Sequence, residues 1–324
     1  MPEWWVERGI GETRAALVEG GRIVESLVEL DGGFRAGERV AARLGSIGQN
    51  GRNAIARTTE GREILLPSRP TGVSEGSALT VEITREAIPG HEPWKRPIGR
   101  TVDGSASSVP PLEARLGGRL LPFPPSPGDP LGEAGWSDLL AEAASGLVDF
   151  AGGRLRLFLT PAMTLIDVDG VLPPDELASA GAAAAGQAIR RLGIAGSIGI
   201  DLPTTRGKAA RAAAAEELDR ALRGTQFERT GVNGFGFVHL IRPRRRPSLL
   251  ELYGEPVAAE ARALLRRAGT AGFGPARLAA HPRVVALLGE NLGWLEQLAV
   301  QRGGAVTLRP DEMLAISAGH VEPA

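Results

Sequence analysis

The sequence predicts a mixed β and α/β fold, with a mainly β N-terminal part, an α/β unit and a small α+β unit at the C-terminus. Three observations support this prediction. Residues 34–88 contain short β-forming runs broken by glycines, residues 153–250 alternate strand-like with helix-like periodicity, and a stretch rich in proline, glycine and serine separates these regions. The 324 residues are enough for two or three domains with buried cores.

The N-terminal part is expected to contain mainly strands and turns. Within residues 1–33, the segments 14–18 and 22–28 are expected to form two strands joined by a Glu-Gly-Gly turn. Residues 34–100 are expected to form a small β-barrel, for which the OB-fold is the commonest candidate. The expected barrel strands are 38–44, 53–58, 62–66 and 78–83. Residues 101–152 are interpreted as a Pro/Gly-rich connection that ends in a short helix, 136–145.

The α/β unit, residues 153–250, is expected to place helices between strands. Its expected strands are 155–159, 163–168, 197–202, 226–230 and 235–241, and its expected helices are 174–192 and 205–223. Leu177, Gly181, Ala184, Ala188 and Leu192 recur along one face of the first helix. This alternation indicates a sheet with helices packed on it. Residues 251–324 are expected to form the α+β unit, with helices 256–267 and 283–302 and strands 305–308 and 315–320.

Composition excludes several classes of site. The chain has no cysteine, so disulfides, thiolate chemistry and cysteine-ligated zinc are excluded. The formal net charge is −1, so any phosphate-binding surface has to be local. We read no signal peptide and no apolar run of the roughly 18 residues that a membrane span needs. The expectation is therefore a soluble, cytoplasmic protein with no membrane partner.

The acidic residues of the α/β unit are the most informative feature. One expected strand ends in Asp167-Val168-Asp169, and the next ends in Asp201. If one helix crosses between these strands they run parallel, and both acidic groups emerge at the carboxyl edge of the sheet, where ligands bind in open α/β sheets. Two close carboxylates favour a hard divalent cation such as Mg²⁺. The alternative is that the aspartates only cap turns, because aspartate is common after strands.

Basic residues of the same unit form a second candidate site. Arg242, Arg244, Arg245 and Arg246 lie just after an expected strand and would suit RNA phosphates. Lys208, on the first turn of the helix after Asp201, could extend that surface. The alternatives are a solvated basic loop for the arginines and an ordinary helix surface for the lysine.

Three segments in order resemble the ribonuclease E/G family. Thr164–Gly170 resembles the family segment Ile-Asp-Val-Asn-Ser-Gly, and Gly196–Leu202 resembles its Gly-Gly-Leu-Ile-Val-Ile-Asp-Phe strand. Phe235-Gly236 and Arg242–Leu249 resemble the family tail that runs from Arg-Phe-Gly to Thr-Arg-Gln-Arg-Leu-Arg-Pro-Ser-Leu. The resemblance is strong over residues 153–250 and weaker elsewhere.

The resemblance implies a fold and an activity. It implies an OB-fold barrel inserted in a ribonuclease-H-like piece, a deoxyribonuclease-I-like α/β catalytic subdomain over 153–250, and a small α+β C-terminal domain. The implied activity is endonucleolytic hydrolysis of single-stranded RNA to 5′-phosphate and 3′-hydroxyl ends, in RNA processing or decay. Asp167 and Asp201 would ligate Mg²⁺, with Mn²⁺ as a substitute, and Phe235 would contact RNA. Asp169 stands where the family has asparagine and is either a third ligand or a residue that tunes metal preference.

Departures from the family keep other interpretations open. Without cysteines the family's zinc link between domains cannot form, so monomer and homodimer both remain open. The segment between the barrel and residue 153 is too short for the domain that senses a 5′-monophosphate. The main alternative is an RNA-binding protein of the same fold with weak or no catalysis. Another is a metal-dependent phosphoesterase with a substrate other than RNA.

Overall fold

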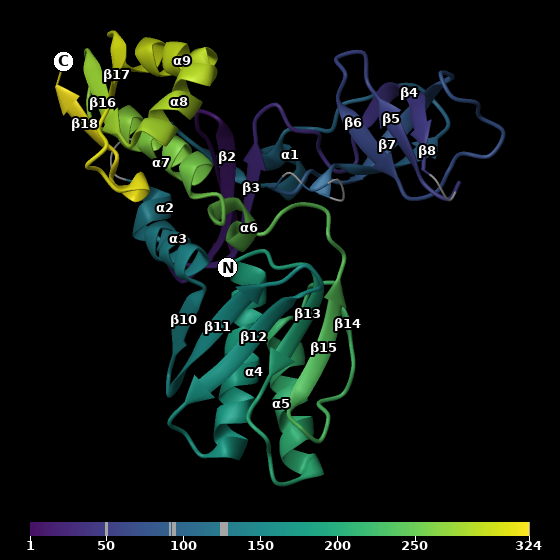
Figure 1. Cartoon of the computed structure of the whole chain (residues 1–324). Helices are drawn as coiled ribbons and strands as arrows, with labels where there is room; N and C mark the ends of the chain where they lie inside the picture. The colour runs from purple at the N-terminus through teal and green to yellow at the C-terminus, as the bar shows by residue number, and fades with distance from the viewer. Residues whose placement is uncertain (49–50, 91, 93–94, 124–128, 324) are drawn as a thin grey trace.

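The computed structural model describes residues 1–48, 51–90, 92, 95–123 and 129–323. It shows a mixed α/β fold with a four-stranded sheet, a closed five-stranded barrel, a six-stranded sheet and a three-stranded sheet (Figure 1). Residues 124–128, which belong to the expected Pro/Gly-rich connection, lie outside the described residues. The expected order of a β-rich N-terminal part, an α/β unit and a small α+β unit is present.

The N-terminal sheet is assembled from segments that lie far apart in the sequence. Its strands are β1 (Glu3–Arg8), β2 (Glu12–Glu19), β3 (Arg22–Leu30) and β9 (Arg119–Leu121), in the order β3-β2-β1-β9. The expected hairpin is β2–β3, whereas β1 and β9 were not expected. Because β9 pairs with β1 in parallel, part of the expected connection belongs to this sheet.

The barrel lies between two strands of that sheet in the sequence. Its strands are β4 (Arg39–Ile47), β5 (Ala54–Arg57), β6 (Glu63–Leu66), β7 (Ala78–Arg85) and β8 (Ile98–Val102), closed in the order β4-β5-β6-β8-β7. Leu44, Ile64 and Val81 are buried inside it. The four expected strands are present, and β8 adds a fifth that extends past residue 100, the expected end of the barrel. Short helix α1 (Leu112–Leu116) follows on the way back to β9.

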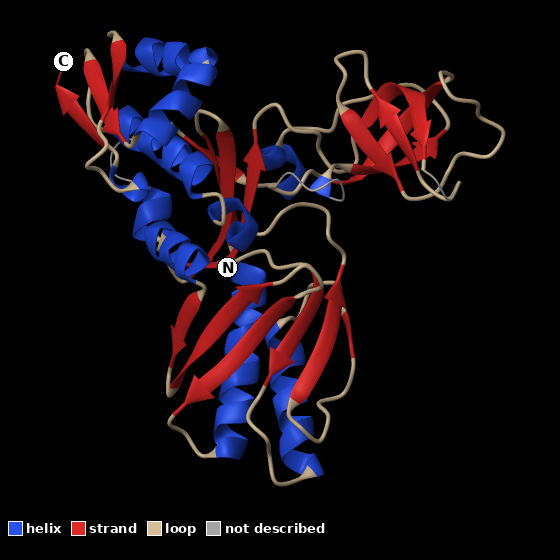
Figure 2. Cartoon of the chain, in the orientation of Figure 1, coloured by secondary structure: helices blue, strands red, loops and turns tan. Residues whose placement is uncertain are grey.

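In the described part of the chain, helices cover one face of the six-stranded sheet and leave the other open (Figure 2). Its strands, in the order β10-β11-β12-β13-β15-β14, are β10 (Leu147–Phe150), β11 (Gly153–Leu159), β12 (Thr164–Gly170), β13 (Gly196–Asp201), β15 (Phe237–Arg242) and β14 (Glu228–Arg229). The helices of the unit are α4 (Pro174–Arg191) and α5 (Lys208–Ala221), and α2 (Pro130–Glu133) and α3 (Trp136–Ser145) precede it. Strands β12 and β13 are parallel, as expected from the crossing helix α4.

Helix α4 packs closely against β12 because its inward face is built from small residues. The expected stripe is buried, and Gly181 lies over Val168, where a Cβ atom on the glycine would be 2.3 Å from Val168 Cγ1. Ile166, Val168 and Ile200 therefore point towards the helices and form the core. The alternate residues of the same strands point to the face that carries no helix.

The C-terminal unit differs from its expected elements at several places, since α6 and β16 were not expected, one expected helix is divided and one expected strand is misplaced. It contains α6 (Leu249–Tyr253), α7 (Pro256–Thr270), β16 (Ala276–Ala280), α8 (Pro282–Glu290), α9 (Leu292–Arg302), β17 (Val306–Pro310) and β18 (His320–Pro323). The helix expected over 283–302 is two helices, because the backbone of Asn291 leaves the helical region at φ −116° and ψ 59°. The strand expected over 315–320 was wrong: Ile316–Ala318 form a 3₁₀ turn, and the strand begins at His320. No helix in the described part of the chain is long and apolar enough to span a membrane.

Buried ion pairs connect these units. Glu12 on β2 accepts a hydrogen bond from Arg262 on α7 at 2.8 Å and also pairs with Arg266, which ties the N-terminal sheet to the C-terminal unit. Glu29 on β3, only 3% exposed, pairs with three arginines from separate parts of the chain. These partners are Arg35, Arg115 and Arg246.

Candidate metal and nucleic-acid site

Asp167 and Asp201 are direct neighbours in the parallel ladder between β12 and β13. Adjacent strands lie about 4.8 Å apart, and laterally paired residues point to the same face of a sheet. Ile166 and Ile200, the preceding pair in the register, face the helices. The two carboxylates therefore share the face that no helix covers, near the carboxyl end of β13.

Arg156, on the antiparallel neighbour β11, occupies the other side of this acidic pair. It is the register partner of Asp167, and its Nη1 atom lies 3.6 Å from Asp167 Oδ2. The same nitrogen forms an ion pair with Asp169. Asp169 is thus oriented towards an arginine.

The environment of Asp167 disfavours its charged form. Partial burial raises the pKa of the carboxyl above its ordinary value of 3.8, and the negative charges of Asp169 and Asp201 raise it further. Arg156 counteracts this shift, because its positive charge and its hydrogen bond lower the pKa of Asp167. A cation between Asp167 and Asp201 would relieve the repulsion in the same way.

The residues fit a divalent ion held by two carboxylates and completed by water and phosphate oxygens, which is the usual way in which proteins bind Mg²⁺. No group of three or more His, Asp or Glu side chains among the described residues is arranged to hold a metal. Asp169 lies two residues beyond the paired position on β12 and forms an ion pair with Arg156. Asp169 as a third ligand therefore receives no support from this arrangement.

Two of the expected RNA-binding residues lie at the same edge of the sheet as the acidic pair. Phe235 precedes β15 by two residues, and its carbonyl accepts a hydrogen bond from Thr204 in the loop that follows Asp201. Its side chain is 83% exposed. Lys208, also exposed, begins α5 just beyond the same loop. An aromatic ring and a cation thus border the edge that contains the carboxylates.

Gly236 explains how the loop carrying Phe235 comes so close to the end of β13. Its φ of 93° lies in the left-handed region, and a Cβ atom would be 2.1 Å from the carbonyl oxygen of Leu202. Only glycine can meet both conditions. The Phe-Gly pair of the sequence therefore has a structural role in placing Phe235.

The basic run lies at the opposite end of the sheet from the acidic pair and from Lys208, which corrects the expectation that Lys208 extends the surface formed by these arginines. Arg242 pairs with Gly196, the first residue of β13, whereas Asp201 is the last. Five residues of strand correspond to about 17 Å. Arg242 is also engaged internally, since its Nη1 donates to the carbonyls of Ile189 and Ile194 at the end of α4.

The other arginines of the run also make contacts within the chain. Arg244 forms an ion pair with Glu251, and Arg246 pairs with the buried Glu29. Arg245 is exposed, and its backbone carbonyl accepts a hydrogen bond from the amide of Glu86 beside the barrel. The run therefore joins the α/β unit to its neighbours, and only the side chain of Arg245 is exposed for a ligand.

Sequence reasoning missed Arg156, although a signal was present. The segment Arg154-Leu155-Arg156-Leu157 alternates polar with apolar residues, which is typical of a strand with one solvated face. Its pairing with Asp167 depends on the register of the β11–β12 hairpin, which the turn at 160–163 fixes.

Comparison with known proteins does not assign the chain to a family. No protein-family model matches the chain, and no curated protein is significantly similar to it.

Proposed function

We propose that the protein is a metal-dependent endoribonuclease that hydrolyses phosphodiesters of single-stranded RNA on the open face of the six-stranded sheet. The observation that carries the proposal is the register pairing of Asp167 with Asp201 on that face. The resemblance of the segments around both aspartates to the ribonuclease E/G family supports RNA as the substrate.

Each residue of the site has a separate task in this proposal. Asp167 and Asp201 would hold Mg²⁺ or Mn²⁺, which when bound supplies positive charge at the phosphate and lowers the pKa of water. Phe235 offers its exposed ring to stack on a base, an interaction that tolerates any base. Lys208 offers a mobile positive charge to a neighbouring phosphate.

A second candidate function is RNA binding with little or no turnover, and Arg156 is the observation that favours it. Its guanidinium already lies between Asp169 and Asp167 and competes with a metal ion for the same negative charge. In this alternative, RNA binds the open face but is released intact.

Cleavage of a labelled single-stranded oligoribonucleotide by the purified chain, with Mg²⁺ or Mn²⁺, tests the proposal. Asp167→Asn and Asp201→Asn should each reduce the cleavage rate by about 100-fold or more, because each removes a metal ligand. Asp149→Asn is the matched control, since this exposed carboxylate on β10 of the same sheet pairs, among the described residues, with Arg154 alone. Equal cleavage by all three variants would remove the acidic pair from the function.

Gel-shift binding of the same oligoribonucleotide separates the two candidates. Retention of intact RNA by the wild-type chain, with no product in either metal, would establish the binding function in place of the nuclease. Products with 5′-phosphate and 3′-hydroxyl ends that disappear in the aspartate variants would establish the nuclease.

A further inference from the structure

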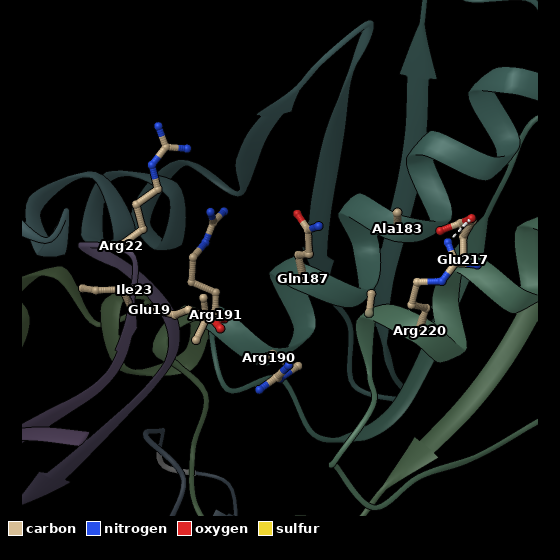
Figure 3. Close-up of a pocket in the computed structure, with 11 residues that line it drawn as sticks. Glu19, Arg22, Ile23, Ala183, Gln187, Arg190, Arg191, Glu217 and Arg220 are labelled. Carbon is tan, nitrogen blue, oxygen red and sulfur yellow. Dashed lines mark hydrogen bonds and ion pairs between the residues drawn. The ribbon is translucent and has the colours of Figure 1, made fainter. Parts of the chain in front are cut away.

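A cavity of about 490 Å³ lies between the β2–β3 hairpin and the outward surfaces of α4 and α5 (Figure 3). Four arginines and one glutamine supply most of its polar lining, namely Arg22, Arg190, Arg191, Arg220 and Gln187. A second cavity, of about 410 Å³, shares Arg22 and Arg191 with it. These two arginines therefore line both cavities.

Arg22 and Arg191 retain donors that could bind an anion. The side chain of Arg22 is exposed, and no described residue forms a hydrogen bond or ion pair with it. Arg191 pairs with Glu142 at 2.6 Å through Nη2, and its side chain is 29% exposed, so its guanidinium group is only partly occupied. In Figure 3 both side chains and that of Gln187 extend to the same side. Guanidinium groups in such an arrangement suit phosphate oxygens.

Most of the remaining charged residues of the cavity lining form ion pairs with residues of opposite charge. Arg220 pairs with Glu217 at 2.6 Å, and Arg190 pairs with Glu25 at 3.4 Å. Because the lining also includes two carboxylates, an extended polyanion would meet repulsion along its length. A ligand with its charge concentrated at one end avoids this repulsion.

The cavity also has an apolar part. Ile23, only 6% exposed, lines it together with Ala183 and Ala221. Small aliphatic groups next to guanidinium groups suit a flat ring that carries a phosphate, as in a nucleotide.

The cavity is separate from the acidic pair. Helix α4 packs its small-residue face on β12, and the cavity lies on the outward side of that helix. Asp167 and Asp201 point to the other face of the sheet, so the two sites do not share residues.

We propose that this cavity binds a nucleoside phosphate, with the phosphates between Arg22 and Arg191 and the base at the other end, against Ala183 and Ala221. The inference does not depend on the nuclease proposal, because it rests on different residues. It predicts that binding persists when the acidic pair is removed.

Isothermal titration calorimetry of the full chain in the presence of EDTA tests this site, with ATP, pyrophosphate and adenosine as probes. ATP should bind, pyrophosphate more weakly, and adenosine not detectably. Arg22→Gln should weaken ATP binding by about tenfold, the equivalent of about 1.4 kcal/mol, because one charge-assisted contact is lost. Gln187→Glu should weaken it at least as much by placing a carboxylate beside the phosphates. Both residues are exposed, so neither substitution threatens the fold.

Two controls make the experiment decisive. Arg277→Gln removes an exposed arginine of β16 outside the cavity and should leave ATP affinity unchanged, as should Asp167→Asn. Equal affinity in the wild type and Arg22→Gln, equal weakening by Arg277→Gln, or no heat with ATP would each overturn the proposal. Displacement of ATP by a single-stranded oligoribonucleotide would overturn the assignment to a small ligand.

Discussion

At the scale of single residues, the ionised carboxylate of Asp167 in the candidate site lowers the stability of the fold. The raised pKa of Asp167, caused first by burial and then by Asp169, means that the folded state binds this proton more tightly than the unfolded chain. The contribution of this proton to the stability of the folded state is therefore complete below the ordinary pKa of 3.8. It is lost as the pH rises through the pKa that Asp167 has in the folded state. At neutral pH the ionised carboxyl works against folding.

Asp167→Asn should therefore leave the Tm unchanged or higher at pH 7 in EDTA, although it should abolish metal-dependent cleavage. The difference from the wild type should shrink as the pH falls below 4. Differential scanning calorimetry across this range measures it.

For Asp149→Asn, the expected change in stability at neutral pH has the opposite sign. The hydrogen bond from Arg154 lowers the pKa of Asp149, so its contribution is present at neutral pH and is lost as the pH falls. This variant should have an unchanged or lower Tm at pH 7. A lower Tm for Asp167→Asn than for Asp149→Asn would show that Asp167 has a structural role.

Arg156→Gln should strengthen metal binding at the acidic pair. A unit charge about 4 Å away contributes about 1 kcal/mol in water, so its removal should lower the Kd for Mn²⁺ by about fivefold. Calorimetric titration with Mn²⁺ measures this without relying on cleavage. Arg154→Gln is the matched control, because Arg154 is occupied by Asp149. An unchanged Kd in Arg156→Gln would mean that this arginine does not compete with the ion.

The two aspartates could be found from sequence because each directly follows a short apolar run and one helix separates the two runs. The contacts of the basic run could not be found in this way. Arg242 and Arg246 look alike in the sequence, yet each contacts groups that are distant along the chain. Arg242 donates to the carbonyls of Ile189 and Ile194, and Arg246 pairs with Glu29. Those partners become visible only when the units pack together.

At the scale of elements, close packing of α4 on β12 outweighs helix propensity. Gly181→Ala gains up to about 1 kcal/mol of helix propensity, but its methyl group would overlap Val168, and overpacking costs about 1–3 kcal/mol. We expect a net loss of stability in urea denaturation.

Gly289→Ala, in the exposed part of α8, is the control for this prediction. A Cβ atom there meets nothing within 4 Å, so the variant should be more stable by about 0.5–1 kcal/mol. If both alanine variants were stabilised, the contact between α4 and β12 would have to be looser than described.

Long periodic elements were predictable, whereas boundaries set by one residue were not. Helix α3 spans 136–145 as expected, and α4 ends one residue earlier than expected. The α8–α9 break depends on Asn291, whose side chain donates to the carbonyl of Leu287. Strand β8 could not be predicted, because prolines and glycines surround it in the sequence. Its pairing partners β6 and β7 lie earlier in the chain, so its place in the barrel depends on tertiary contacts.

At the scale of the whole molecule, a buried carboxylate fixes the C-terminal unit to the N-terminal sheet. Glu12→Ala leaves Arg262 buried without its partner, which should lower the free energy of unfolding by about 3–5 kcal/mol. Amide hydrogen exchange should accelerate in α7 more than in the six-stranded sheet.

Glu322→Ala removes a carboxylate from a more exposed pair with Arg309 and should lower the free energy of unfolding much less than Glu12→Ala does, because solvent screens the pair. Similar losses for Glu12→Ala and Glu322→Ala would argue that the burial of Glu12 contributes nothing to docking.

The position of the barrel between β3 and β9 has a consequence for how this architecture can vary. Its two connecting segments are held together at the neck by paired backbone hydrogen bonds between Arg39 and Ser107, at 2.9 and 2.8 Å. The chain therefore enters and leaves the barrel at one place, with the two connecting segments side by side. Chains of this architecture can therefore exchange, enlarge or lose the barrel while the N-terminal sheet keeps its strand order.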